Sequence, residues 1–100
     1  MTDTKTSPEV EVRTRQIPPY HVVLANDDYH TYTFVVSVLC KALGYPVERA
    51  HQLMLEAHTS GRAIVWTGPK EVAELKAEQI ATFREEPYGS LDCTIEPAGA

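Results

Sequence analysis

Basic residues are scarce in this sequence, and their scarcity excludes one class of partner. The 100 residues include nine Lys and Arg against fourteen Asp and Glu, for a formal net charge of −5 at pH 7. Nucleic-acid binding depends on clustered Lys and Arg that contact phosphates. Because no such cluster is present, we expect no nucleic-acid partner.

Long apolar runs are also missing. No stretch approaches the ~18 apolar residues that a membrane-spanning helix needs. The N-terminus lacks the apolar core of a signal peptide, and it carries Asp3, Glu9 and Glu11, whereas organellar transit peptides have few acidic residues. We therefore expect a cytoplasmic protein with no membrane partner.

Two cysteines, Cys40 and Cys93, lie far apart in the sequence. Neither belongs to a Cys-x-x-Cys motif or to a Cys/His cluster, which are the patterns of zinc sites. Cysteines of cytosolic proteins are mostly reduced and pack as small hydrophobic side chains. We therefore expect two buried thiols, no metal site and no cofactor.

The composition divides the chain into a tail and one domain. Residues 1–18 are rich in Thr, Pro and charged residues without apolar periodicity, which predicts a disordered N-terminal tail. Residues 19–97 have the length and the hydrophobic content of a single domain. Residues 98–100 are expected to fray.

Three segments have the patterns of β-strands. Residues 20–25 form a continuous apolar run rich in β-branched residues, which predicts a buried strand, and residues 62–67 predict a second. Residues 91–96 alternate apolar and polar side chains, which is the pattern of a half-buried strand in an antiparallel sheet.

Three further segments have helical periodicity: residues 31–43, 46–58 and 70 to about 84. The hydroxyl of Thr31 can cap the first helix, and Gly44 can end it. The order β-α-α-β-α-β predicts an α+β domain in which three helices pack against a three-stranded antiparallel sheet.

Helical periodicity also predicts which side chains face the core. One side of the second helix carries Val47, His51, Met54 and His58. We therefore expect His58 to point with the apolar side chains and away from the solvated face. The side chains of the third helix that are expected to face inward are Val72, Leu75, Ile80 and Phe83.

The turn Asn26-Asp27-Asp28 directly follows the first strand. Asn and Asp are common where a strand stops, and two adjacent carboxylates repel each other unless donors or a cation lie nearby. A turn with a helix cap, together with a core histidine whose hydrogen bonds are satisfied, would explain these residues structurally.

A binding site is the functional alternative. Asn26, Asp27 and a neutral His58 would offer acceptors to the three N–H donors of an ammonium group. Met, Val and Leu side chains at the base of the same cleft would receive an apolar group. The residue types therefore suit an ammonium that is attached to an apolar side chain.

Two paired segments, Tyr20–Tyr29 (YHVVLANDDY) and Met54–His58 (MLEAH), resemble those of one known family. Further matches follow in the same order: Phe34-Val35-Val36 with Val38-Leu39, Gly61-Arg62-Ala63, Glu71-Val72-Ala73-Glu74 with Lys76, and Leu91 with Cys93-Thr94. The matches extend from Pro18 to Glu96 without obvious insertions. The sequence is similar to the ClpS family, the adaptors of the ATP-dependent Clp protease that recognise N-terminal destabilising residues (the bacterial N-end rule).

The resemblance implies a non-catalytic adaptor, which we expect to be a monomer, for substrate proteins that begin with Leu, Phe, Tyr or Trp. It implies that Asn26, Asp27 and His58 hold the α-amino group of the first residue, with Asp28 and His30 at the rim. The implied pocket for the side chain of that residue is lined by Tyr32, Val35, Met54, Ala57 and Leu91.

The resemblance also implies a partner. Glu71 and Lys76 match a family surface that docks on the N-terminal domain of a Clp AAA+ ATPase of the ClpA type. The tail before Pro18 matches an extension that the family uses to deliver its substrates. The sequence leaves open whether the ATPase is ClpA or ClpC.

The sequence departs from the family pattern beside the implied site. His30-Thr31 stands in place of a usual Thr-Pro pair, Tyr32 in place of a usual Met at the rim, and Ala57 in place of a usual Val. The family also places the first helix cap one residue before Thr31. A docking domain with an altered or vestigial pocket is therefore one alternative.

A hydrolase or metal enzyme that uses Asp27, Asp28, His30 and His58 is the other alternative. His51 and His58 stand seven positions apart, too far for the i, i+4 chelation of an HExxH helix. No nucleophile lies in an activating pattern. The residue pattern favours binding over catalysis.

Overall fold

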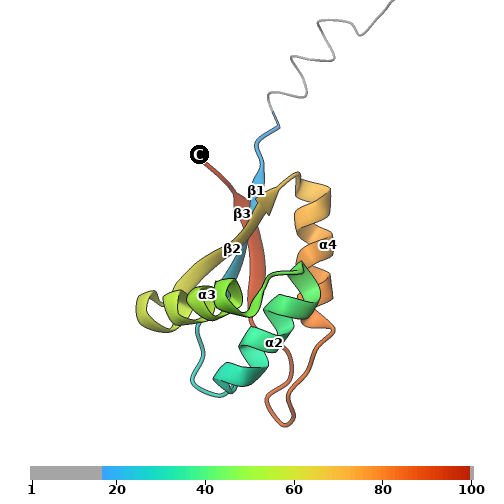
Figure 1. Ribbon diagram of the computed structural model, residues 1–100. Coiled ribbons are helices and arrows are strands. Elements are labelled where there is room, and N and C mark those ends of the chain that lie inside the picture. The colour runs from blue at the N-terminus through green and yellow to red at the C-terminus, as the bar shows by residue number, and fades with distance from the viewer. Residues whose placement is uncertain (1–16, 100) are drawn as a thin grey trace, which may run out of the picture.

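The computed structural model describes residues 17–99, which form three strands and three helices in the order β-α-α-β-α-β (Figure 1). The strands are β1 (Tyr20–Ala25), β2 (Arg62–Gly68) and β3 (Cys93–Pro97). The helices are α2 (Tyr32–Leu43), α3 (Val47–Ser60) and α4 (Lys70–Ala81). The predicted α+β fold is confirmed. Residues 1–16 of the predicted tail, and residue 100, lie outside the described residues.

β1 is the central strand and pairs antiparallel with β2 on one edge and with β3 on the other. As its apolar run predicts, three consecutive residues, Val22, Val23 and Leu24, are buried. Trp66 of β2 lies opposite Val22, whereas Ile64 lies opposite Val23, so one extra residue of β2 forms a bulge between them.

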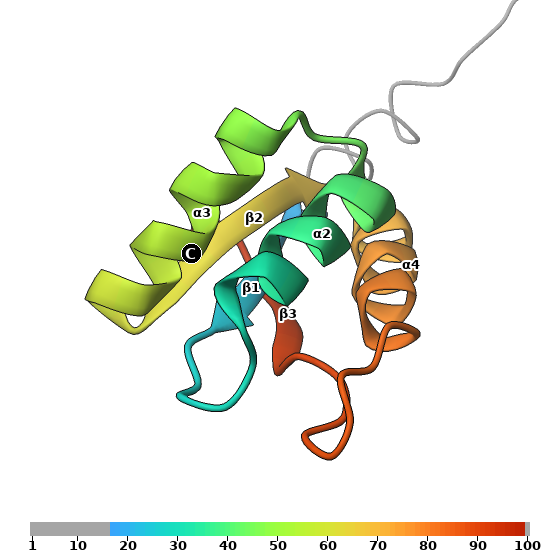
Figure 2. The same ribbon diagram turned by 60° about the horizontal axis from the view of Figure 1, so that its bottom comes forward.

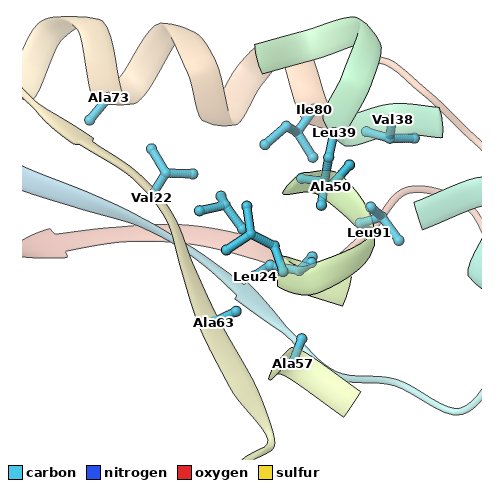
Figure 3. Close-up of a cluster of buried hydrophobic side chains, with 12 residues drawn as sticks. Val22, Leu24, Val38, Leu39, Ala50, Ala57, Ala63, Ala73, Ile80 and Leu91 are labelled. Carbon is cyan, nitrogen blue, oxygen red and sulfur yellow. The ribbon is translucent and has the colours of Figure 1, made fainter. Parts of the chain in front are cut away.

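The helices cover one face of the sheet. α3 packs on β2, α4 packs on all three strands, and α2 lies against both α3 and α4 (Figure 2). Figure 3 shows Val22 and Leu24 of β1 in one cluster with Ala63 of β2, Ala57 of α3 and Ile80 of α4. Because side chains from all three helices enter this cluster, the domain has a single two-layer core.

Local signals set both ends of α2. The side-chain oxygen of Thr31 accepts from the Phe34 amide (3.1 Å), and Gly44 ends the helix with a left-handed φ of 74°. Thr31 is therefore the cap that its hydroxyl predicts, and the cap is not one residue earlier as the family resemblance implies.

His58 does not point away from solvent as predicted, whereas the predicted burial of Met54 on the same side of α3 is confirmed. The buried residues of this helix are Ala50, Leu53, Met54 and Ala57, whereas Val47 and His58 are exposed. Two of the four buried residues are alanines, so the buried face is rotated from the one that the larger apolar residues predict. His58 then lies at the edge of the contact.

The prediction for α4 is confirmed for Ile80, and for Phe83 just beyond the helix, which packs against the core, but it is wrong for Val72 and Leu75. Ala73 and Ile80 are its buried residues, whereas Val72 is 37% exposed and Leu75 is 51% exposed. The helix also ends at Ala81, three residues before the predicted end. β3 begins at Cys93, two residues later than predicted.

The cysteines are both free, and both are half-buried. This agrees with the expected reduced state but not with full burial.

At the C-terminal end, the Ala98 amide donates to the carbonyl of Pro19 (2.9 Å). One backbone hydrogen bond therefore links the chain beyond the last pair of β1 and β3, Tyr20 and Pro97.

Replacing the Thr31 cap tests how α2 begins. Thr31→Ala leaves the Phe34 amide without its acceptor, so we expect the free energy of unfolding to fall by about 1 kcal/mol. Thr31→Ser keeps the hydroxyl and should stay within a few tenths of a kcal/mol of the wild type. Urea unfolding, followed by the fluorescence of the single tryptophan, measures both. Equal losses in the two variants would show that the threonine methyl group matters, not the cap.

Candidate functional site

Backbone hydrogen bonds hold the chain on both sides where it leaves β1. The Ala25 amide donates to the carbonyl of Asp92 (2.9 Å), and the Asn26 amide donates to the carbonyl of Gly61 (2.9 Å). Gly61 ends α3 with a φ of 91°, a left-handed conformation that favours glycine. The start of the turn is therefore fixed beside the end of α3.

The carboxylate of Asp27 organises this turn. Its Oδ1 accepts from the amides of Tyr29 (2.8 Å) and His30 (2.9 Å), and its Oδ2 lies 2.8 Å from Nδ1 of the His30 ring. Three donors thus relieve the repulsion that is expected between adjacent carboxylates. Asp28 is exposed instead.

The side chain of His30 is only 4% exposed and lies between two acceptors. Nδ1 faces the carboxylate of Asp27, and Nε2 lies 2.8 Å from the carbonyl oxygen of Gly89. A carbonyl and an ionised carboxylate can only accept, so both ring nitrogens donate. The ring, which also stacks on Phe34 at 5.3 Å between centroids, is therefore an imidazolium in this arrangement.

His30 and Asp27 stabilise each other's charged form. Burial alone would lower the pKa of His30, but the hydrogen bonds to Gly89 and Asp27 and the charge of Glu85 outweigh it and raise that pKa. Burial alone would raise the pKa of Asp27, but the amides of His30 and Tyr29 and the His30 ring lower it. The wall of the turn therefore contains an ion pair.

The loop between α4 and β3 reaches the start of α2. Glu85 accepts from the Thr31 amide at Oε1 (2.9 Å) and from the Thr31 hydroxyl at Oε2 (2.7 Å). Gly89, the partner of His30, belongs to the same loop, which the Glu85 amide closes by donating to the carbonyl of Gly89 (2.9 Å). His30 and Thr31 thus attach the turn to this loop.

A cavity lies between the turn, the start of α2, the last turns of α3 and the segment before β3. It encloses about 320 Å³ of atom-free space, part of which is open to solvent. It is lined by Leu24, Ala25, Asn26, Asp27, His30, Tyr32, Val35, Met54, Ala57, His58 and Leu91. Met54, Ala57 and Leu91 are buried, so the floor is apolar and the polar groups lie at the rim.

The structure gathers nearly all of the site residues that the sequence predicts. Of the predicted amine-binding, rim and pocket residues, every one except Asp28 lines the cavity. At its mouth, the hydroxyl of Tyr32 lies 2.9 Å from Nε2 and 3.4 Å from Nδ1 of His58. Glu71 and Lys76 belong to α4 and lie outside the cavity lining.

Comparison with known proteins identifies the family. The family model of the ATP-dependent Clp protease adaptor protein ClpS matches residues 15–94, which is most of the chain. The chain belongs to the ClpS family. It is thus a ClpS adaptor of the Clp protease, as the paired turn and helix segments predict.

Curated ClpS proteins match nearly the whole chain. The ATP-dependent Clp protease adapter proteins ClpS of Salmonella arizonae and Escherichia coli are each 45% identical to it over 92 residues, which are 90% of this chain and 87% of theirs. Among solved structures, Agrobacterium tumefaciens ClpS2 bound to L-phenylalaninamide has a TM-score of 0.76 and 32% identity, over 82% of this chain and 99% of that chain. The ClpS relationship therefore extends to the fold.

Some residues around the ClpS cavity were not predicted. Leu24 and Ala25 line it, and their position directly before the turn was the available signal. Glu85 binds Thr31, which lies 54 residues earlier in the sequence, and Gly89 binds His30, which lies 59 residues earlier. No local pattern marks such contacts.

The hydrolase and metal-enzyme alternatives gain no support from the geometry. Within residues 17–99, no group of three or more His, Cys, Asp and Glu could hold a metal ion. Burial, with a contribution from Asp92, raises the pKa of Cys93 to about 12, so that thiol stays protonated near neutral pH.

Among residues 17–99, no helix has the length and apolarity to cross a bilayer.

The ion pair predicts how stability depends on pH. Because folding raises the pKa of His30, the stability that its charge contributes is present in full below about pH 6.5, its unfolded pKa, and is lost as the pH rises through the folded value. We expect His30→Ala to lower the free energy of unfolding by about 1–3 kcal/mol at pH 6 and by less at pH 9, in urea titrations.

His51→Ala is the matched control, because His51 is an exposed histidine on α3 and should show no such pH dependence. The lowered pKa of Asp27 acts at the other end of the range, since its contribution disappears only as the pH falls through that value. An equal loss in His30→Ala at pH 6 and at pH 9 would contradict the coupling.

Proposed function

We propose that this chain binds the first residue of substrate proteins, namely Leu, Phe, Tyr or Trp, and delivers those proteins to a Clp AAA+ unfoldase for ATP-dependent degradation. The observation that carries the proposal is the meeting of acceptors on Asn26, Asp27 and His58 with an apolar floor in one cavity. The A. tumefaciens relative bound to L-phenylalaninamide supports it, because that ligand combines a free amine with an apolar side chain.

Asp27 keeps the capacity to accept from an ammonium group. A carboxylate oxygen has two lone pairs, and Oδ2 has one partner, the His30 ring. The side-chain oxygen of Asn26 and a neutral imidazole of His58 supply the other two acceptors. Because His30 offsets the charge of Asp27, the amine is held mainly by hydrogen bonds to these three acceptors.

The floor of the cavity selects the side chain. Met54 and Leu91 are buried and apolar, and methionine adapts its shape to different guests. Burying a large apolar side chain contributes ~1.5–3 kcal/mol, and each charge-assisted hydrogen bond contributes a similar amount. After the costs of association, a total of ~8 kcal/mol corresponds to roughly micromolar affinity, which suits a carrier that must release its substrate.

The exposed face of α4 is our candidate for ATPase docking. At 100° per residue, the exposed residues Glu71, Val72 and Leu75 lie on one side of this helix, and the half-buried Lys76 lies at the edge of that side. Val72 and Leu75 are exposed apolar side chains next to residues of opposite charge, and this combination is typical of a protein interface. We propose that this face binds the N-terminal domain of a ClpA-type ATPase and that residues 1–18 act in delivery.

Acetylating a peptide tests the requirement for a free amine. An acetylated peptide that begins with Phe keeps its side chain but loses the charge and two donors, so we expect its affinity to fall at least tenfold below that of the free peptide. Fluorescence anisotropy measures both affinities. Equal binding of the two peptides would overturn the proposal.

Two histidines of α3 provide the matched variants. His58→Ala removes a proposed acceptor and should weaken the binding of the unacetylated peptide by about 1–3 kcal/mol. His51→Ala changes the same helix outside the cavity lining and should leave that affinity unchanged. If neither peptide binds the wild type while the ATPase still does, the chain is a docking domain with a vestigial pocket.

Reversing one charge on α4 separates docking from capture. Glu71→Lys should leave peptide affinity unchanged but slow the Clp-dependent degradation of a Leu-initiated reporter at least several-fold, because charge complementarity governs association. Glu56→Lys makes the same charge change at an exposed residue of α3 and should not slow degradation. Equal rates for the two variants would place docking elsewhere.

A further inference from the structure

The mouth of the cavity is closed by one side-chain contact. The hydroxyl of Tyr32 lies 2.9 Å from Nε2 of His58, and the two rings meet edge to face with centroids 5.2 Å apart. Among the described residues, neither side chain has another hydrogen-bond partner. The hydroxyl can donate to the imidazole lone pair, which is the acceptor that the proposed function requires.

The cavity is too small, as it stands, for the side chain of a first residue. Of the atom-free space in the cavity, the centre of a water molecule can occupy only about 20 Å³, which is roughly room for one water molecule. A Leu or Phe side chain needs several times that space. A guest can enter only after part of the wall has moved.

Tyr32 is an exposed part of the wall. It is the first residue of α2 and is 51% exposed, whereas Met54, Ala57 and Leu91 are buried. Tyr32 also lines a second, larger groove between α2 and α3, of about 540 Å³, together with Val36, Cys40, Val47 and His51. Rotation about its Cα–Cβ bond would carry the ring from the cavity toward this groove.

We propose that Tyr32 closes the empty site and that the α-ammonium of the guest takes the place of the Tyr32 hydroxyl on His58. This inference rests on the proposed function. A neutral imidazole has one lone pair, so the phenol O–H and the ammonium N–H compete for it directly. The ring leaves for the groove as the guest side chain enters the cavity.

The competition has a measurable size. When the competent state is only a fraction of the population, the apparent affinity is reduced by that fraction. Removing one hydrogen bond of ordinary net strength from the closed state changes that fraction roughly two- to tenfold. Because the group that competes with the hydroxyl is the amine, the apparent affinity is reduced by the same factor for every first residue.

Tyr32→Phe tests the proposal, because it removes the hydroxyl and keeps the ring. We expect free peptides that begin with Phe or Leu to bind roughly two- to tenfold more tightly than to the wild type, by the same factor, and mostly through faster association in stopped-flow anisotropy. Tyr29→Phe is the matched control. Tyr29 is exposed and stacks on Tyr88 at 5.8 Å between centroids, and its loss of a hydroxyl should change nothing.

A second measurement needs no ligand. Ring ¹⁵N chemical shifts of His58 report a hydrogen bond to its nitrogens, so they should differ between the empty wild type and Tyr32→Phe, and peptide should abolish the difference. Unchanged or weaker binding by Tyr32→Phe would overturn the proposal and show that the hydroxyl stays on His58 in the complex. If the wild type does not distinguish free from acetylated peptide, the proposed function fails, whatever this variant does.

Discussion

The burial of β1 constrains the rest of the structure. The strand is paired on both edges, its Val22 and Leu24 enter the core, and Val23 is buried on the other face. A shift of one residue would move every one of these side chains to the wrong face. The point where the chain leaves the sheet is therefore fixed at Ala25, and the cavity forms at the end of the central, buried strand.

The wall of the cavity is assembled by polar links between segments that are distant in the sequence. The family resemblance places a Thr-Pro pair where this chain has His30-Thr31. A proline at the first turn of a helix sets the backbone through its fixed φ. Here hydrogen bonds from His30 to Gly89 and from Thr31 to Glu85 join the same segment to the loop before β3. A backbone restraint is thereby exchanged for side-chain contacts with a neighbouring loop.

Features that depend on neighbours in the sequence could be predicted, and features that depend on packing could not. The apolar run of β1 and the Thr31 cap are local, and both were predicted. The buried faces of α3 and α4 were predicted only in part. Met54 and Ile80 are buried as expected, but Val72 and Leu75 are exposed, and Ala57 and Ala73, whose small side chains carry little hydrophobic signal, are buried instead. The candidate site could be predicted as a set of residues, because the resemblance to the ClpS family assigns Asn26 and His58 to one site. The hydrogen bonds that hold the site to the loop before β3 could not be predicted, because the loop that supplies Gly89 has no recognisable sequence pattern.

The Asp27–His30 ion pair bears on how the site would behave as ionic strength changes. Attraction between exposed charges is screened beyond about 8 Å at physiological salt, whereas hydrogen bonds at contact distance are hardly affected. With the charge of Asp27 offset inside the wall, the amine would be held mainly by the geometry of its acceptors and little by a long-range field. Such a site would also discriminate against Lys side chains, whose ammonium groups have the same charge but carry no apolar side chain on the adjacent carbon.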